Sequence, residues 1–363
     1  MRWPAKSRFA VVAAVSVSLA SDACESRTAR EERTSRIVSV REALVQADSG
    51  VVLAGTFTRP AAARAAGARV ARARVAGARL AVAASKPVAS DAVDRTTRWP
   101  AVLLLSGSGP QDRDGARVEL PGYAPFRDIA DSLVGDGFAV LRLDDRGTGA
   151  SGGRFEGATT FDFARDVTAA IRWLRAQPDV DAQRIVLLGH SEGALVAMLA
   201  ASLDDSVAAL VLLGAAGRTG RELARWQRHA LVTGDGAVFP LAERASVLAR
   251  AESEAEAAAE HNRWLQAWFD LDPRVVAKRV RVPTLLLHGA NDRQVPATDA
   301  DVLAVALRTG GASSVEVRRF PSTNHLFLND ENGDPRGYVR LAERRVRPDA
   351  TRAITDFLLR ALR

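Results

Sequence analysis

The chain has 363 residues, of which 47% are hydrophobic and 26% are charged, so it is long and apolar enough to bury one large core or two modest ones. Its formal net charge of +7 comes mostly from arginine, without a ribbon of interleaved aromatic and basic residues, which argues against a nucleic-acid partner. Cys24 is the single cysteine, which excludes an internal disulfide framework and an all-cysteine metal site.

The N-terminus has the pattern of an export signal. Three basic residues open the chain: Arg2, Lys6 and Arg8. An apolar run over 9–20 follows, and Ser21-Asp22-Ala23 then offers small residues at the spacing that a signal peptidase reads. The apolar run 9–20 is shorter than a helix that crosses a membrane. We therefore predict a signal peptide over 1–23, a polar tether over 24–36, and a periplasmic or extracellular protein.

The next segments predict a hairpin and then an insertion. Two β-rich runs, 37–45 and 51–57, flank a turn at 48–50, as in an antiparallel hairpin. Residues 60–98 are rich in Ala, Arg, Val and Gly, and they do not separate one apolar face from one charged face. We interpret 60–98 as a low-complexity insertion.

Two features suggest a weak membrane association. Cys24 directly follows the predicted cleavage site, so lipidation of the processed N-terminus is one hypothesis, although Ser21 stands where such a site usually has leucine. The arginines of 60–98 form a basic arm that can touch anionic lipid, which is the second hypothesis.

From Trp99 onward, apolar runs alternate with amphipathic segments. The predicted strands are 101–105, 138–143, 184–188, 208–213, 284–288 and 314–320. The predicted helices are 125–133, 160–176, 194–201, 298–307 and 350–362. Such alternation is typical of a parallel sheet with right-handed crossovers. Together with the hairpin it predicts an α/β fold with a mostly parallel, eight-stranded sheet flanked by helices.

The pattern over 215–282 predicts helices without a strand. This stretch therefore divides the predicted core into two parts, 37–214 and 283–363. Its helical segments are 222–231, 241–261 and 263–269. Inserted after the sixth strand, it forms a helical cap over the edge of the sheet where α/β proteins place their sites. Four cap aromatics either line an apolar acyl pocket or pack the cap on the body: Trp226, Trp264, Trp268 and Phe269.

The strongest chemical motif is Gly189-His190-Ser191-Glu192-Gly193, between a predicted strand and a predicted helix. Glycines two positions either side of Ser191 allow a sharp strand-to-helix turn that exposes the serine hydroxyl. Ser191 is the candidate nucleophile, and the Glu192 amide is a candidate donor to an oxyanion.

A serine nucleophile needs a base and a carboxylate that orients the base. Of the five histidines, His325 lies in the loop after the last predicted strand, at the same edge as Ser191, and is the candidate base. Asp292 follows the strand 284–288 and is the candidate acid, since the order Ser191, Asp292, His325 suits this type of sheet. Asp299 is the alternative carboxylate, interpreted as a residue that binds free amides at its own helix N-terminus.

Two loops complete the predicted site. Ser106-Gly107-Ser108-Gly109-Pro110 follows the third strand, and Gly107 or Ser108 is expected to donate the second amide of an oxyanion hole. No Gly-Lys-Ser/Thr follows, which excludes a phosphate-binding loop. The charged segments 111–114 and 144–147 are expected to form ion pairs that brace these loops.

With these motifs placed, the chain resembles the α/β-hydrolase superfamily, and most closely its bacterial esterase-like members, the dienelactone-hydrolase-like and serine-aminopeptidase-like domains. The resemblance spans about 99–330 and implies a carboxylic-ester hydrolase without a cofactor, acting on a small acyl ester. It is specific for fold and catalytic residues and does not define the substrate. Residues 60–98 depart from the family pattern, which usually has only a few residues there.

Three functions remain open at this stage. The main hypothesis is a secreted serine hydrolase that cleaves carboxylic esters through an acyl-enzyme. An aminopeptidase or an acyltransferase would use the same three residues. A non-catalytic binding module on the same fold is the third.

The predicted signal peptide can be tested directly. Mass spectrometry of the exported protein is expected to show a chain that begins at about residue 24, because the small residues at 21–23 precede the cleaved bond. An exported protein that keeps Met1 would contradict the prediction.

Overall fold

The computed structural model describes residues 38–47, 50–61, 98–233 and 239–363. The predicted signal peptide 1–23, the tether 24–36 and most of the insertion 60–98 lie outside the described residues.

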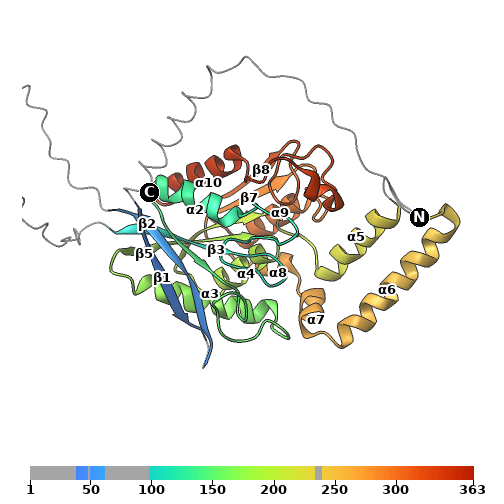
Figure 1. Cartoon of the computed structure of the whole chain (residues 1–363), viewed down its shortest axis with the longest axis horizontal. Helices are drawn as coiled ribbons and strands as arrows, with labels where there is room; N and C mark the ends of the chain where they lie inside the picture. Colours follow the sequence, from blue (N-terminus) through green and yellow to red (C-terminus); the bar gives the residue numbers. More distant parts are fainter. Residues whose placement is uncertain (1–37, 48–49, 62–97, 234–238) are drawn as a thin grey trace, which may run out of the picture.

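The described residues form one eight-stranded sheet in the order β1-β2-β4-β3-β5-β6-β7-β8 (Figure 1). Its strands are β1 (Val38–Gln46), β2 (Val52–Pro60), β3 (Trp99–Leu105), β4 (Ala139–Leu143), β5 (Val180–His190), β6 (Val207–Leu213), β7 (Thr284–Gly289) and β8 (Val315–Phe320). β2 pairs antiparallel with both β1 and β4, and all other neighbours pair parallel. The predicted fold class is confirmed.

Helices cover both faces of the sheet. On one face lie α2 (Pro125–Gly135) and α10 (Pro348–Ala361), and on the other lie α3 (Thr160–Arg175), α4 (Glu192–Ala201), α8 (Pro273–Ala277) and α9 (Asp299–Gly310). Successive residues of the central strands alternate between the two cores: Leu103 packs with α3 and α4, and Leu104 packs with α2. Burial on both faces explains why these strands are uninterrupted apolar runs.

Several boundaries differ from the predicted ones. β2 continues to Pro60, because it pairs with β1 along the whole strand. β5 starts at Val180, four residues early, because Val180 pairs with Trp99 before a bulge in the β3–β5 ladder. The short helix α8 was not predicted. It begins after Asp272, whose side chain accepts a hydrogen bond from the Arg274 amide at 2.8 Å.

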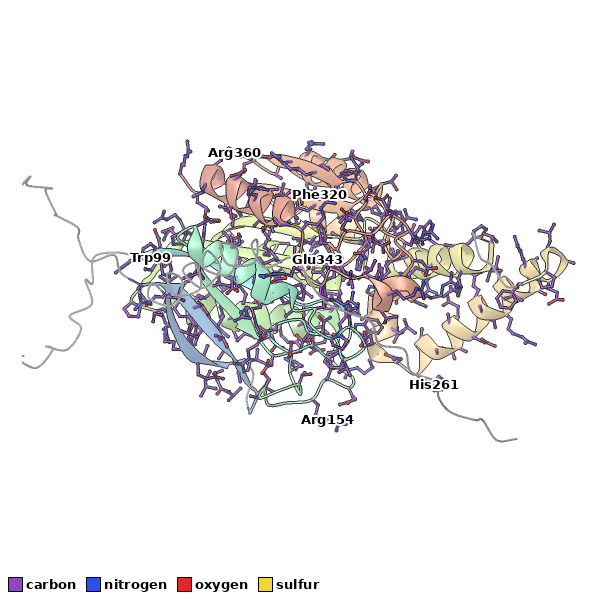
Figure 2. The ribbon with its side chains drawn as sticks, turned by 45° about the horizontal axis from the view of Figure 1, so that its top comes forward. Trp99, Arg154, His261, Phe320, Glu343 and Arg360 are labelled. Atoms are coloured by element: carbon purple, nitrogen blue, oxygen red, sulfur yellow. The ribbon has the colours of Figure 1, made fainter. Side chains whose placement is uncertain are left out.

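The cap follows β6, as predicted. It contains α5 (Gly220–Thr233), the 3₁₀ turn η1 (Leu241–Glu243), α6 (Arg244–Glu260) and α7 (Arg263–Asp270). Figure 1 shows α5 and α6 extending away from the body, and in Figure 2 Trp99 lies on the left and His261, at the end of α6, on the right. A second 3₁₀ turn, η2 (Pro335–Arg340), precedes α10.

Two hydrogen bonds join the cap to the C-terminal ends of strands. The Trp264 indole Nε1 donates to Glu192 Oε1 at 2.9 Å. The side-chain amide of Gln227 donates to the backbone carbonyl of Gln294 at 2.7 Å. Glu192 follows β5 and Gln294 follows β7. The cap therefore lies over the edge of the sheet that the sequence predicted for the site.

The turn between β5 and α4 is packed too closely for side chains at its two glycines. An ideal Cβ on Gly189 would lie 2.1 Å from the carbonyl oxygen of Gly193. An ideal Cβ on Gly193 would lie 2.3 Å from the carbonyl oxygen of Leu105 on β3. In both cases the obstacle is backbone, which cannot move without shifting a strand or a helix.

Gly189→Ala is expected to lower the free energy of unfolding by about 3 kcal/mol or more, because the added methyl meets backbone. Gly135→Ala is the matched control, since nothing lies within 4 Å of its ideal Cβ at the end of α2. The control should change stability by no more than about 1 kcal/mol. Urea denaturation measures both, and equal stabilities for the two variants would contradict the packing argument.

Candidate active site

Ser191 lies between β5 and α4 with φ 56° and ψ −118°, one of three described non-glycine residues with a positive φ. This region costs an ordinary residue on the order of 1–3 kcal/mol, and such strain clusters at functional sites. The Ser191 amide donates to the Leu213 carbonyl at the end of β6, at 2.8 Å. The serine is thereby held half-buried at the C-terminal edge of the sheet.

The structure brings Asp292 and His325 together. His325 Nδ1 donates to Asp292 Oδ2 at 2.7 Å, which leaves Nε2 of the neutral imidazole as an acceptor. The other carboxylate oxygen, Oδ1, accepts from the amides of Gln294 and Val295 at 2.8 and 2.9 Å. Asp292 is only 6% exposed. Hydrogen bonds to both of its oxygens thus hold the Asp292 carboxylate in place beside the His325 imidazole.

His288, at the end of β7, is a second imidazole on the same carboxylate. Its Nε2 lies 3.2 Å from Asp292 Oδ2 and 3.1 Å from the Val295 carbonyl, and the side chain is 1% exposed. Burial by itself would raise the pKa of Asp292. The charges and hydrogen bonds of His325 and His288 outweigh burial and hold that pKa well below its usual range.

Sequence reasoning placed His288 at a strand end but gave it no role. The signal that would have found it is its spacing, four residues before Asp292 at the end of a buried strand. With this spacing the loop after β7 folds back onto the end of the strand, so the Asp292 carboxylate contacts the His288 imidazole.

His190, next to Ser191, joins the elbow to the histidine loop. Its Nε2 donates to the His325 carbonyl at 2.9 Å, and the two rings lie 4.7 Å apart. Burial, reinforced by the neighbouring His325, lowers the pKa of His190 to about 3, so this ring is neutral near pH 7.

Gly214 marks the place where the predicted residues converge. An ideal Cβ there would lie 3.1 Å from the ring of His325 and 3.7 Å from Asp292 Oδ2. Gly214 directly follows Leu213, whose carbonyl accepts the Ser191 amide. A side chain at this position would therefore crowd the imidazole beside the strand end that holds the serine, and the φ of 58° also favours glycine.

Asp299 does not contact His325 in the described structure. It is fully buried at the start of α9, where it accepts from the Gly217 amide at 2.9 Å and pairs with Arg218 at 2.5 Å. Asp299 thus accepts from a free amide from the first turn of its helix, as expected, but the amide belongs to Gly217 and not to the helix itself. Its partner is the loop between β6 and α5, because the carboxylate faces that loop and its arginine.

The loop after β3 lies against the elbow. An ideal Cβ on Gly107 would lie 3.2 Å from Cβ of Ser191, whereas Ser108 is exposed. No other described residue accepts a hydrogen bond from the amide of Gly107 or Ser108. Glu192 is the first residue of α4, so its amide has no acceptor within that helix. These amides therefore have no protein acceptor among the described residues.

Ion pairs brace the charged loops, as expected from the sequence. Arg113 pairs with Asp144 at 2.8 Å and Arg146 pairs with Asp166 at 2.6 Å. Asp114 pairs with Arg127 and Arg142.

Asp145 differs from its neighbours, since it forms no ion pair with another described residue. It accepts from the Ser106 hydroxyl at 2.6 Å and from the Gln111 amide at 2.9 Å, which ties down both ends of the loop after β3. Burial raises the pKa of Asp145 to about 7, although these hydrogen bonds oppose the shift.

The Glu192 side chain connects the elbow to the cap. This carboxylate, on a residue that is 7% exposed, accepts from the Thr160 hydroxyl at 2.7 Å and from the Trp264 indole at 2.9 Å. Trp264 stacks on Trp268 with ring centroids 5.5 Å apart, and Trp268 contacts the buried Phe269. Trp264, Trp268 and Phe269 therefore contact one another in the cap, and Trp264 also binds the body through Glu192.

The described residues lack a metal-binding cluster and a membrane-spanning helix. No group of three or more His, Cys, Asp or Glu side chains there is placed to hold a metal ion. None of the helices in the described ranges is long and apolar enough to cross a membrane.

The sheet order, the helical cap after β6 and the serine between β5 and α4 define a protein of the α/β-hydrolase class. A family model described as "Serine aminopeptidase, S33" matches residues 123–332, more than half of the chain. The chain therefore belongs to this hydrolase family, in agreement with the resemblance seen in the sequence.

Two relatives show how far the similarity extends. The chain is 29% identical over 240 residues to esterase EstD of Thermotoga maritima, covering 64% of this chain and 56% of EstD. It is 24% identical over 251 residues to the uncharacterized peptidase YuxL of Bacillus subtilis, covering 67% of this chain and 33% of YuxL. The chain thus spans little more than half the length of EstD and a third of YuxL.

Solved structures share the fold. The Pyrococcus furiosus esterase Pf2001 matches with a TM-score of 0.55 at 16% identity, over 92% of this chain and 94% of that chain. Est1E of Butyrivibrio proteoclasticus, solved with ferulic acid bound, matches with a TM-score of 0.51 at 15% identity, over 88% and 99%. At such identities the likeness supports the fold alone.

The raised pKa of Asp145 predicts a pH-dependent stability. Its folded pKa of about 7 lies above the unfolded value of about 4, so the folded protein binds more protons between them and stability falls as pH rises through this window. Between pH 5 and pH 8 the wild type is expected to lose on the order of 3 kcal/mol relative to Asp145→Asn. Urea denaturation at both pH values measures the difference, and parallel pH profiles would contradict the assignment.

Proposed function

We propose that the protein is a serine hydrolase that cleaves carboxylic esters through an acyl-enzyme. Ser191 is the proposed nucleophile, His325 the base and Asp292 the residue that orients the base. The backbone amides of Glu192 and of Gly107 or Ser108 are the proposed oxyanion hole. The N-terminal pattern over 1–23 supports the further proposal that the enzyme is exported.

The single observation that carries the proposal is the 2.7 Å hydrogen bond from His325 Nδ1 to Asp292 Oδ2, beside the strand end that holds Ser191. This bond selects the tautomer whose Nε2 can accept a proton, and the buried carboxylate stabilises the imidazolium that then forms. The three residues come from loops after β5, β7 and β8, which end at one edge of the sheet.

The reaction then proceeds in two halves. Ser191 Oγ forms a bond to the acyl carbon while its proton passes to His325 Nε2, and the negative oxygen is stabilised by the two amides. The bond from the acyl carbon to the alcohol oxygen breaks, and His325 gives its proton to the leaving alcohol. Water, deprotonated by His325, then attacks the acyl-enzyme, releasing the acid and restoring the Ser191 hydroxyl.

The family description favours a second candidate. Because the chain belongs to a family described as serine aminopeptidases, the same residues would serve amide cleavage. A panel of short acyl esters and aminoacyl amides distinguishes the two activities, since both share the nucleophile and differ in the leaving group.

Ser191→Ala and His325→Ala are each expected to lower kcat for p-nitrophenyl ester hydrolysis by about 10³-fold or more, because the three residues act as a unit. Ser202→Ala, at the other end of α4, is the matched control and should keep wild-type activity. A fluorophosphonate should label the wild type and the control but not Ser191→Ala. Full activity in Ser191→Ala would refute the proposal.

A further inference from the structure

His288, at the end of β7, and His325 contact the same oxygen atom of Asp292. His288 Nε2 lies 3.2 Å from Asp292 Oδ2, which also accepts the hydrogen bond from His325 Nδ1 at 2.7 Å. The backbone carbonyl of Val295 lies 3.1 Å from the same His288 nitrogen. Two imidazoles therefore share one carboxylate oxygen, and only one of them, His325, belongs to the proposed catalytic residues.

The two atoms that face His288 Nε2 define its tautomer. A backbone carbonyl oxygen can only accept a hydrogen bond, and the same is true of an ionised carboxylate. Asp292 is ionised near pH 7, because its pKa lies well below its usual range in spite of its burial. His288 Nε2 must therefore carry a proton and point it toward these two oxygens.

His288 does not take the serine proton itself. Its side chain is 1% exposed, and a nitrogen that already donates to buried oxygens has no free electron pair for another proton. Val295 contacts both members of this pair, because its amide also donates to Asp292 Oδ1 at 2.9 Å. The loop after β7 thus holds the acid between the strand-end imidazole and a backbone amide.

We propose that His288 is a positioning residue: its Nε2–H fixes Asp292 Oδ2 beside His325 and weakens the attraction of this oxygen for an imidazolium proton. The inference rests on the function proposed above. The N–H dipole has its positive end at the shared oxygen, so it opposes the positive charge that His325 acquires when it takes the serine proton. His325 therefore becomes free of its proton, and competent as a base, at a lower pH than it would beside an unshared carboxylate.

Three other titratable groups surround this part of the site: His190, Tyr338 and Asp330. Their hydrogen bonds go to the His325 carbonyl, the Gln294 side chain and the Asn324 side chain. Among the titratable side chains that the structure describes, His288 and His325 are the two that contact the Asp292 carboxylate. The effect on the base is therefore assigned to His288.

The experiment measures how fast a fluorophosphonate labels Ser191 as a function of pH, because this reaction needs the same base as ester cleavage. His288→Leu removes the donor and keeps a side chain of similar size. Its acid limb, where labelling rises as His325 loses its proton, should move to higher pH by about half a unit to one unit, as for one lost hydrogen bond. The acid limb of kcat/KM for p-nitrophenyl acetate should move equally.

His288→Gln is the conservative variant, since its amide nitrogen stands as many bonds from Cβ as the imidazole Nε2 and donates at every pH. It should shift the acid limb by less than half as much as leucine does. His261→Gln, exposed at the end of α6, is the matched control and should leave the profile unchanged. Coincident acid limbs in the wild type and a folded His288→Leu overturn the proposal. Equal shifts in the leucine and glutamine variants also overturn it, because they would reflect packing and not the donor.

A second measurement needs only the wild type. A long-range proton–nitrogen correlation spectrum should show the His288 ring protonated at Nε2, and a ring protonated only at Nδ1 overturns the proposal. If the wild type is labelled and the shift alone is missing, the proposed function stands and this inference fails. A wild type that neither hydrolyses esters nor reacts with the fluorophosphonate contradicts the proposed function, and the inference falls with it.

Discussion

The backbone contact between Gly189 and Gly193 is the constraint on which the rest of the site depends. It lets β5 turn directly into α4, with Ser191 held at a positive φ between them. The turn is held from its neighbours as well, by the carbonyl of Leu105 against Gly193 and by the carbonyl of Leu213 on the Ser191 amide. The strain at one residue is thus maintained by three adjacent strands.

The two sides of this turn have different physical characters. Toward β7 and β8 lie imidazoles and a carboxylate: Asp292 receives His325 and His288, and His190 donates to the backbone of His325. Toward β3 and β4 lie Gly107 and a cavity whose lining mixes leucine and phenylalanine side chains with charged ones such as Asp145 and Arg146.

Glu192 joins these parts to the cap. Its amide begins α4 beside the serine, while its carboxylate binds Thr160 on α3 and Trp264 on α7. The stacked indoles of Trp264 and Trp268 then continue into the cap, whose outer helix α6 buries little more than Ala259 against its neighbours. The cap therefore contacts the elbow through an inner layer of aromatic side chains, and most of α6 faces away from the site.

The sequence by itself determined the fold class, the cap after the sixth strand and the serine turn, because these follow from local patterns: apolar runs, helix periodicity and glycine spacing. It also identified Asp292 and His325 as candidate site residues, since the C-terminal ends of parallel strands lie at one edge of the sheet. Only the tertiary structure decided the partners of Asp299, the second imidazole at His288, the packing of the cap aromatics and the cavity beside Phe163. Each of these depends on side chains that are distant in sequence and meet only after packing, so no local pattern records them.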